Sequence, residues 1–449
     1  MLEHLKNTYR RLPLSVRNPL RSVRKGIKSI LLRSSNNRLA HCHRQRKYYR
    51  ILKIAVTGSK GKTTTSLLCA HILNASYDKV GCATTDGLYI NKEMCCEGSH
   101  AGNRGPRELL RRHGVDAVVL ETAREGIIKE GLFLGSVDGA ALLNIGVDHV
   151  GMDGVRTQID MALIKKRVTD TSSGVVVLNA GDPIVRALLP EYMERSLVLY
   201  SLNRHDVENH VAAGGRAVTL DEDKHIVIVS GNNPGDLQRI VHVSELSFCR
   251  DGLEFNVQNS IAAVALTYPF IGDAAILSER LRTFVPNMVG GSDRFYVAQE
   301  TPFLVVSDRT CSATGLQGLL PAFESMASSG GIRRCVLTAA GNRPDWIFEE
   351  MARLLVAAGF LEIFIYEHRS SLNGRSPNEV VRLLRDSLLK LGMPPDSVSI
   401  MRGFGSCVER VVGISEAGDT VLILGVSDWE KRSVVRRCIR RIGLDVSWP

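Results

Sequence analysis

The stretch KIAVTGSKGKTTTSLLCAHIL, residues 53–73, constrains the fold most strongly, because it reads as a buried strand, a glycine turn and a helix. This context is typical of a loop that binds phosphate through backbone N–H groups. In such a loop Lys62 reaches the terminal phosphates and Thr63 can bind Mg²⁺. A strict G-x-x-x-x-G-K-[ST] match would need glycine at Val56, so the alternative is a glycine turn with a chance Gly-Lys-Thr. The residues expected at the phosphates are Gly58, Ser59, Lys60, Gly61, Lys62, Thr63 and Thr64.

Short apolar runs alternate with amphipathic stretches after Arg50, which predicts an α/β fold. The runs ILKIAVTG, DAVVLET, GAALLNI and GVVVLNAGDP are expected to be buried strands that end in polar loops. A second series, FLVVSD, RRCVLTAAGN, LEIFIYE and DTVLILG, follows Arg294, with helical segments such as PDWIFEEMARLLVAAG between the strands. We therefore expect an arm at 1–50, a first α/β domain at 51–293 and a second at 294–449.

The positive charge of the chain is concentrated in its first 50 residues. The 449 residues include 57 Lys+Arg and 47 Asp+Glu, a formal net charge of +10. Residues 1–50 contain 14 Lys+Arg and one acid, so they carry +13 and the remainder carries −3. Within this arm, PLRSVRKGIKSILLRSS predicts a short basic amphipathic helix. It either packs on its own body or docks on a partner, a membrane surface or nucleic acid, and no nucleic-acid motif favours the last.

The cysteine pattern and the length of the apolar runs indicate in which cellular compartment the protein is expected. Ten cysteines, with Cys95 next to Cys96 and no C-x-x-C pair, argue against a disulfide scaffold and a zinc ribbon. A reducing cytosol fits this pattern best. Because no apolar run has signal-peptide length near the N-terminus or the ~20 residues of a membrane span, we expect a cytoplasmic protein that does not span a membrane.

Two further strand ends carry candidate metal ligands. Glu121 ends the run VDAVVLE, where an acid would lie at the ligand-binding edge of an α/β sheet. Its alternative roles are to cap the next helix or to face solvent. The run LLNIGVDHVG repeats the arrangement with Asp148 and His149, and the alternative for this histidine is a purely structural role.

Taken together, these segments resemble the Mur ligases, ATP-dependent enzymes that join a carboxylate to an amine, and in particular the Mur-ligase-like C-terminal half of cyanophycin synthetases. The matching pieces occur in the family's order from Ile51 to about Gly443. They are VTGSKGKTTT, TTDGLYI, RGPRELL, VDAVVLETAREGI, NIGVDHVGMDGVRT, MALIKKRV, VLNAGDP, NVQNSIAAVA, AAGNRPD and LNGRSPNEVVRLL. The resemblance implies a P-loop central ATPase domain followed by a Rossmann-like α/β domain.

The resemblance also implies a role for each matched residue. Lys62 and Thr63 would hold ATP with Mg²⁺, and Glu121 and His149 would bind metal. Lys165, with Lys166 as the alternative register, would be carbamylated and support a second Mg²⁺. The nucleotide would also be contacted by Asn256 and Asn259 on the adenine side, by Arg294 at the phosphates and by Asp308 at the ribose. The residues with a catalytic role would be Lys62, His149, Lys165 and Arg294. Candidate substrate contacts in the matched segments are Thr84, Thr85, Asp86, Arg107, Arg124 and Arg343.

The chain departs from the family pattern at the start of the second domain. The family's Asp-Tyr-Ala-His-Asn-Pro is replaced by SDRTCSATG, which keeps Asp308. Poly-γ-glutamate synthases also depart from this element. Cys311 within it is either a nucleophile or a packed thiol, and the second is favoured because no His-Asp partner is near in sequence. The chain shows no segment like an ATP-grasp half or a UDP-sugar-binding domain.

The expected function is ATP-dependent ligation of an amino acid to a peptide or amino-acid carboxylate through an acyl phosphate. The alternatives are a polymerising ligase like the poly-γ-glutamate synthases and a degenerate ATP-binding subunit of a biosynthetic complex. The expected partners are ATP, the two substrates and, through the basic arm, a separate ATP-grasp enzyme or an acidic surface.

Overall fold

The computed structural model describes residues 51–112, 114–147, 150, 153–231, 237–249, 254–285, 295–298, 302–308, 310–327, 330–425 and 429–441. The basic arm and its predicted helix lie outside these residues, as do His149 and Arg294. Within the described residues, no helix has the length and apolar character needed to cross a membrane.

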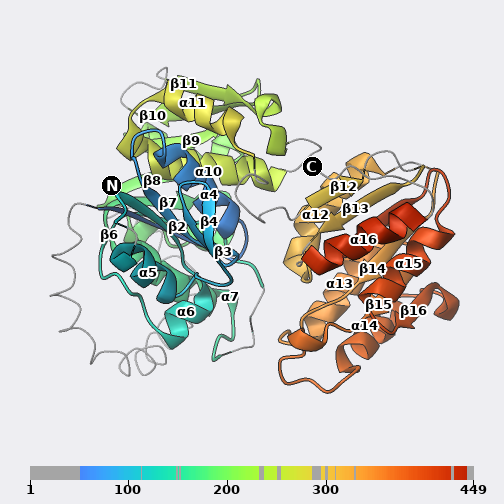
Figure 1. Cartoon of the computed structure of the whole chain (residues 1–449). Coiled ribbons are helices and arrows are strands. Elements are labelled where there is room, and N and C mark those ends of the chain that lie inside the picture. Colours follow the sequence, from blue (N-terminus) through green and yellow to red (C-terminus); the bar gives the residue numbers. More distant parts are fainter. Residues whose placement is uncertain are drawn as a thin grey trace, which may run out of the picture. The chain divides into compact units, whose positions relative to one another are not determined.

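The chain divides into two compact units (Figure 1). The first runs to Ile145 and takes in Gln158–Ser247 and Val257–Gly290, and the second comprises Gly146–Thr157, Phe248–Asn256 and Gly291–Pro449. The last division falls close to Arg294, where the sequence predicts the second α/β domain.

In the described residues, the first unit has a sheet of 11 strands in the order β11-β10-β9-β8-β7-β6-β1-β5-β2-β3-β4. Neighbouring strands from β9 to β2 are parallel, and antiparallel hairpins extend both edges. The strands are β1 Leu52–Thr57, β2 Val80–Ala83, β3 Gly87–Ile90, β4 Glu93–Glu97, β5 Ala117–Glu121, β6 Val137–Leu142, β7 Ser172–Asn179, β8 Ser196–Tyr200, β9 Arg216–Leu220, β10 His225–Ser230 and β11 Leu237–His242.

Helices cover both faces of this sheet. The helices are α4 Lys62–Leu73, α5 Arg104–Arg112, α6 Arg124–Lys129, α7 Gln158–Asp170, α8 Pro183–Arg186, α9 Glu208–Ala212, α10 Glu254–Ile271 and α11 Ala274–Thr283. Ala55 and Leu120 face a core that α5, α6 and α7 complete. On the opposite face, Gly139 approaches Phe270 of α10, and α4 packs with α11. This layering follows from strands that are apolar on both faces, as the unbroken runs predict.

The second unit is a smaller doubly wound domain. Its described strands form a six-stranded sheet in the order β12-β13-β17-β14-β15-β16, parallel except for β12. The elements are β12 Phe295–Ala298, β13 Leu304–Asp308, α12 Ala313–Met326, β14 Arg333–Leu337, α13 Asp345–Ala357, β15 Glu362–Tyr366, α14 Glu379–Lys390, β16 Val398–Met401, α15 Phe404–Ile414, β17 Thr420–Leu424 and α16 Trp429–Arg441.

Alternate residues of the second sheet enter two different cores. Leu422 and Leu424 pack with α12, α13 and α14, whereas Val421 and Ile423 pack with α15 and α16. The strands predicted from both series of apolar runs are confirmed at β1, β5, β6, β7, β13, β14, β15 and β17, and the predicted helix is α13. The α/β class is therefore confirmed in both units.

Candidate functional site

The candidate site lies at the carboxyl ends of the central strands of the first unit. The turn after β1 begins at Gly58, β5 ends at Glu121, and β6 is followed by Asn144. The chain goes from β1 to β2 on one side of β1 and later returns to β6 on the other side, so β1 marks the switch point of the sheet. Open α/β sheets bind ligands at such a point.

The glycine turn leads directly into α4, as the sequence predicts. Gly61 caps the helix with φ +79°, a left-handed conformation that favours glycine, and a Cβ there would overlap the Asn259 side chain. Gly61 has no side chain with which to cap α4, and Thr65 N–H, donating to the Gly61 carbonyl at 2.9 Å, makes the first helical bond. The helix therefore offers no acceptor for the amides of residues 61–64, which is the arrangement that binds anions.

Glu121 is held beside the loop by hydroxyl and amide donors. It is buried, and Thr63 Oγ1 donates to its Oε2 at 2.8 Å. Thr85 donates to the same carboxylate twice, from its N–H to Oε2 at 2.9 Å and from Oγ1 to Oε1 at 2.6 Å. Burial, and secondarily the Glu121 charge, raise the pKa of the Cys82 thiol, so this neighbouring cysteine stays protonated. The site thus gathers carboxylate and hydroxyl oxygens, the ligand type that Mg²⁺ prefers.

Two lysines approach the loop from different elements. Lys165, buried on α7, donates from Nζ to the Gly58 carbonyl at 2.7 Å. Lys62 donates to the Ser59 carbonyl at 3.2 Å. Lys166 instead pairs with Asp170 at 2.7 Å on the outer side of α7. Of the two registers that the sequence leaves open, Lys165 is therefore the one that lies at the phosphate loop.

Asn144 is a residue of the site that the sequence did not single out. Its Oδ1 accepts from Ser59 N–H at 3.0 Å and from Lys60 N–H at 2.8 Å, while its Nδ2 donates to the Lys60 carbonyl at 3.1 Å. The available signal was a polar residue at the end of the apolar run GAALLNI, where a strand end meets the ligand-binding edge.

Other predicted contacts in the first unit have mainly local partners. Asn259 is buried, and its Oδ1 accepts from Thr65 Oγ1 at 3.3 Å behind the loop. Thr84 is buried and holds the β2–β3 turn, donating to the Gly87 carbonyl and accepting from the amides of Asp86 and Gly87. Thr64 and Asp86 are half-buried. Whether these residues contact ligands stays a prediction.

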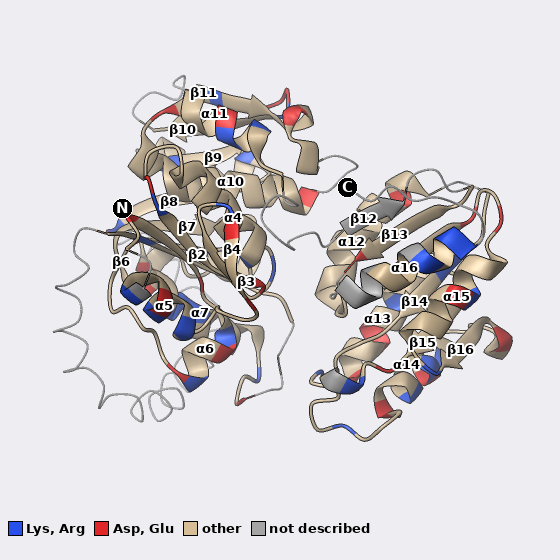
Figure 2. Ribbon diagram, viewed as in Figure 1, with Lys and Arg blue, Asp and Glu red and all other residues tan. Residues whose placement is uncertain are grey.

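The two predicted substrate arginines differ in exposure. Arg124 is buried at the start of α6, close in sequence to the end of β5. Arg107 is exposed on α5, with its guanidinium 5.6 Å from the centroid of the Phe133 ring. Figure 2 shows Lys and Arg residues gathered on α5, whose sequence is RGPRELLRR.

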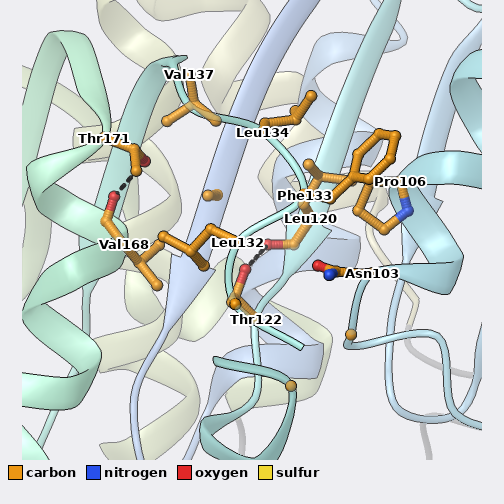
Figure 3. A pocket seen from close by; sticks show the side chains of 14 residues that line it. Asn103, Pro106, Leu120, Thr122, Leu132, Phe133, Leu134, Val137, Val168 and Thr171 are labelled. Carbon is orange, nitrogen blue, oxygen red and sulfur yellow. Dashed lines mark hydrogen bonds between the residues drawn. The ribbon is translucent and has the colours of Figure 1, made fainter. Parts of the chain in front are cut away.

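A small cavity lies beneath α5, α6 and α7. It has a volume of about 30 Å³ and a mostly apolar lining that includes Leu120, Phe133, Leu134 and Val168 (Figure 3). Thr122 and Thr171 in this lining donate to the carbonyls of Leu120 and Val168. A cavity of this size has room for about one or two water molecules, so it gives no binding site for a peptide or a nucleotide.

Three of the predicted residues lie in the described part of the second unit. Asp308 is buried at the end of β13 and accepts from Thr310 N–H at 2.6 Å. Arg343 is buried in the loop after β14, and its carbonyl accepts from Arg375 Nη2 at 2.6 Å. Asn256 Nδ2 donates to the Phe248 carbonyl at 2.5 Å.

The altered segment after β13 begins a helix. Ser312 caps α12 by accepting from Gly315 N–H at 3.3 Å, so this departure from the family pattern has a structural role. Cys311 is half-buried beside it. The cysteines that the structure describes are all free thiols.

A separate group of potential metal ligands lies on the β9–β10 hairpin. Ligand atoms of Asp221, Asp223 and His225 lie within 4.8 Å of one another. Arg239 already pairs with Asp221 and with Asp223, each at 2.8 Å. This guanidinium neutralises the carboxylates, so the cluster is explained as an ion-pair network of the hairpin.

Known proteins share this sequence pattern and fold. Residues 56–267 match the family model described as Mur ligase middle domain. The chain is 28% identical over 346 residues to a cyanophycin synthetase of Synechocystis sp., in a region covering 76% of this chain but 38% of that relative. A pseudomurein peptide ligase type C from Methanothermus fervidus has a TM-score of 0.60 at 17% identity, covering 88% of this chain and 79% of its own. MurF ligase from Thermotoga maritima, solved with ADP, has a TM-score of 0.57 at 16% identity, covering 88% and 82%.

A phosphate loop at the switch point of a parallel sheet, with a buried carboxylate beside it, defines a phosphate-loop α/β protein. Together with the matched segment, these features make residues 56–267 similar to the middle domain of the Mur ligases. The chain spans less than two fifths of the length of the cyanophycin synthetase that it matches.

Proposed function

We propose that this protein uses ATP to join the carboxylate of a peptide or amino acid to the amine of an amino acid. The observation that carries the proposal is the hydrogen bond of 2.8 Å between Thr63 of the phosphate loop and the buried Glu121. It joins the predicted phosphate site to a carboxylate at the neighbouring strand end. The match of residues 56–267 to the Mur ligase middle domain and the ADP complex of the MurF neighbour support ATP as the nucleotide.

The reaction proceeds in two steps. An oxygen of the substrate carboxylate attacks the γ-phosphorus of ATP, the bond to the β,γ-bridging oxygen breaks, and an acyl phosphate and ADP form. The amine nitrogen then attacks the acyl carbon, inorganic phosphate leaves, and the amine loses a proton as the amide forms. Because the first step brings two anions together, the site must supply positive charge and N–H donors, as Lys62 and the amides at the start of α4 do.

The residues at the loop fit a magnesium ion. Glu121 is buried and already shares its carboxylate with the hydroxyls of Thr63 and Thr85, so hard oxygen donors converge there. Glu121 and Thr63 would hold the Mg²⁺ that accompanies ATP, and the ion would neutralise charge on the phosphate oxygens. His149, which lies outside the described residues, belongs to the same proposed metal site.

Lys165 is the proposed carbamate. Its amine would add to CO₂ with loss of a proton, giving an Nζ-carboxylate whose negative charge suits a second Mg²⁺. The support is its buried position at the loop, with Nζ 2.7 Å from the Gly58 carbonyl. The remaining proposed contacts are Asn256 and Asn259 on the adenine side, Asp308 at the ribose, Arg294 at the phosphates, and Thr84, Thr85, Asp86, Arg107, Arg124 and Arg343 at the substrates.

Replacing Lys62 with alanine tests the proposal. We expect at least about a 100-fold loss of phosphate release, measured with ATP, Mg²⁺, acidic peptides and mixed amino acids, because the charge opposite the transferred phosphoryl group is removed. Lys129→Ala is the matched control, since Lys129 lies on α6 and pairs there with Glu125. Equal turnover by wild type and Lys62→Ala would exclude the loop from the reaction. If the wild-type protein binds the nucleotide but releases no phosphate, the result would favour a degenerate ATP-binding subunit over a ligase. If the nucleotide binds equally well without Mg²⁺, the proposed metal site would be excluded.

A further inference from the structure

The side chain of Asn144 hydrogen-bonds to both backbone groups of Lys60, a residue of the phosphate loop. The carboxamide accepts from Lys60 N–H at 2.8 Å and donates to the Lys60 carbonyl at 3.1 Å. Its Oδ1 and its backbone carbonyl also accept from Ser59 N–H, at 3.0 and 2.9 Å. Asn144 thus binds two consecutive amides of the loop although it is 84 residues away from Lys60 in sequence.

This pairing needs an amide side chain of this length. A carboxamide carries both a donor and an acceptor, as a peptide group does. Aspartate would keep the acceptor but lose the donor to the Lys60 carbonyl, and alanine would lose both. Serine is too short to span the N–H and the carbonyl of one residue.

The backbone around Asn144 is itself fixed from the neighbouring strand ends. The Leu143 carbonyl accepts from Asn179 Nδ2 at 2.9 Å and from Tyr200 Oη at 3.1 Å. On the other side, Ile145 N–H donates to Asp182 Oδ2 at 2.9 Å. Asn144 therefore connects the loop to a rigid part of the sheet.

The position of Ser59 and Lys60 decides where the next amides point. Gly61 follows directly and begins α4 in a left-handed conformation without a side-chain cap. A loop that turned at residues 59 and 60 would carry the N–H groups of residues 61–64 with it. We infer that Asn144 is a positioning residue, which holds the phosphate loop in its anion-binding conformation before the nucleotide arrives. This inference rests on the proposed function, because the anion is taken to be the phosphate chain of ATP.

The test compares the MgADP affinity of full-length variants by titration calorimetry and their thermal unfolding midpoints. For Asn144→Ala we expect roughly a tenfold or larger loss of affinity, since the three side-chain bonds that hold the loop are lost. Asn144→Asp should lose at least as much affinity, because its charge would also lie beside the phosphates. It keeps the acceptor to Ser59 and Lys60, so it provides a second folded variant.

Asn91→Ala is the matched control. The Asn91 carboxamide also pairs with backbone in both directions, accepting from Val80 N–H at 2.9 Å and donating to the Asp78 carbonyl at 3.2 Å. Val80 begins β2, whereas the phosphate loop lies at the carboxyl ends of the strands. We expect Asn91→Ala to lower the unfolding midpoint and to keep wild-type affinity for MgADP.

The outcomes separate the inference from the function on which it rests. If Asn144→Ala and Asn144→Asp bind MgADP as wild type does while Lys62→Ala does not, the positioning role is wrong and the nucleotide site stands. If affinity falls equally in the Asn144 and Asn91 variants, a general loss of stability explains it and the inference is overturned. If wild type itself does not bind MgADP, the proposed function and the inference fail together.

Discussion

Lys165 and Lys166 are neighbours in sequence with opposite surroundings. Successive residues of an α-helix point about 100° apart. On α7 this turns Lys165 toward Gly58 and turns Lys166 away from the loop, where it is half-buried and pairs with Asp170 at 2.7 Å and with Glu191 at 3.3 Å. A positively charged amine cannot bind a metal ion, whereas a carbamate carries a carboxylate that can. This is the physical reason for proposing that Lys165, buried at the phosphate loop, is carbamylated.

Replacing Lys165 with alanine is expected to abolish ligase turnover, because the proposed second carboxylate of the site is lost. Short carboxylic acids such as acetate should restore part of the activity by entering the space that the side chain leaves. The measurement is phosphate release as a function of added acid. Lys166→Ala is the control and should keep its activity without acid. A Lys165 variant that no acid rescues would argue for a role of the amine itself.

The phosphate loop shows which features of the site can be predicted from sequence. Strand, glycine turn and helix are adjacent in the chain, so residues 58–63 could be assigned directly. The bonds of Asn144 to Ser59 and of Thr85 to Glu121 join residues 85 and 36 positions apart. Such pairs depend on which strands become neighbours in the sheet, and local periodicity does not contain that information.

Among the elements, α4 couples the phosphate loop to the interior. It is buried along most of its length, and its last turn contains His71. His71 lies against α11, with Nε2 3.1 Å from Thr283 Oγ1. Thr283 Oγ1 donates to the Glu279 carbonyl, so a neutral His71 that donates from Nε2 satisfies both groups. Burial first, and then the positive charges of Lys92 and Arg280, lower the pKa of His71 to about 4.

The lowered pKa of His71 predicts how stability depends on pH. Between pH 6.5 and 4 the unfolded chain binds a proton at His71 that the folded chain does not, so acid favours unfolding in this window. His71→Gln keeps a donor for Thr283 but removes the titration. Relative to this variant, wild type should lose roughly 2 kcal/mol of unfolding free energy between pH 7 and pH 5. Urea unfolding of both proteins measures this difference, and parallel pH profiles would refute the assignment.

At the scale of the whole molecule, the chain combines two α/β units that each have their own core. The sequence predicted both, because each supplies a separate series of apolar runs. It did not predict the antiparallel hairpins β3–β4 and β10–β11 that widen the first sheet. β4 is mostly exposed and β11 has the mixed sequence LQRIVH, so these two edge strands lack the apolar runs by which the central strands were recognised. β10, HIVIVS, has such a run.

The core of the second unit contains one buried charge network. Arg334, on β14, is 5% exposed and pairs with the buried Asp419 and with Glu362. Asp419 also accepts from the amides of Ile332 and Glu416, each at 2.8 Å, so it ties the start of β14 to the turn before β17. Removing the arginine would leave a buried carboxylate without its counter-ion, which is far more costly than losing an exposed pair.

Arg334→Met should therefore destabilise the second unit by about 3 kcal/mol. Because Arg334 is not among the proposed nucleotide contacts, the affinity for MgADP should stay at the wild-type value as long as the second unit remains folded. The measurement is hydrogen exchange of the full-length protein, followed by mass spectrometry. We expect faster exchange in β14, β15 and β17 and unchanged exchange in β1, β5 and β6. Arg353→Met, which breaks an exposed pair with Glu350 on α13, should leave both regions unchanged. Faster exchange spreading equally through β1 and β5 in the Arg334 variant would mean that the two units unfold as one, and the assignment of separate cores would be wrong.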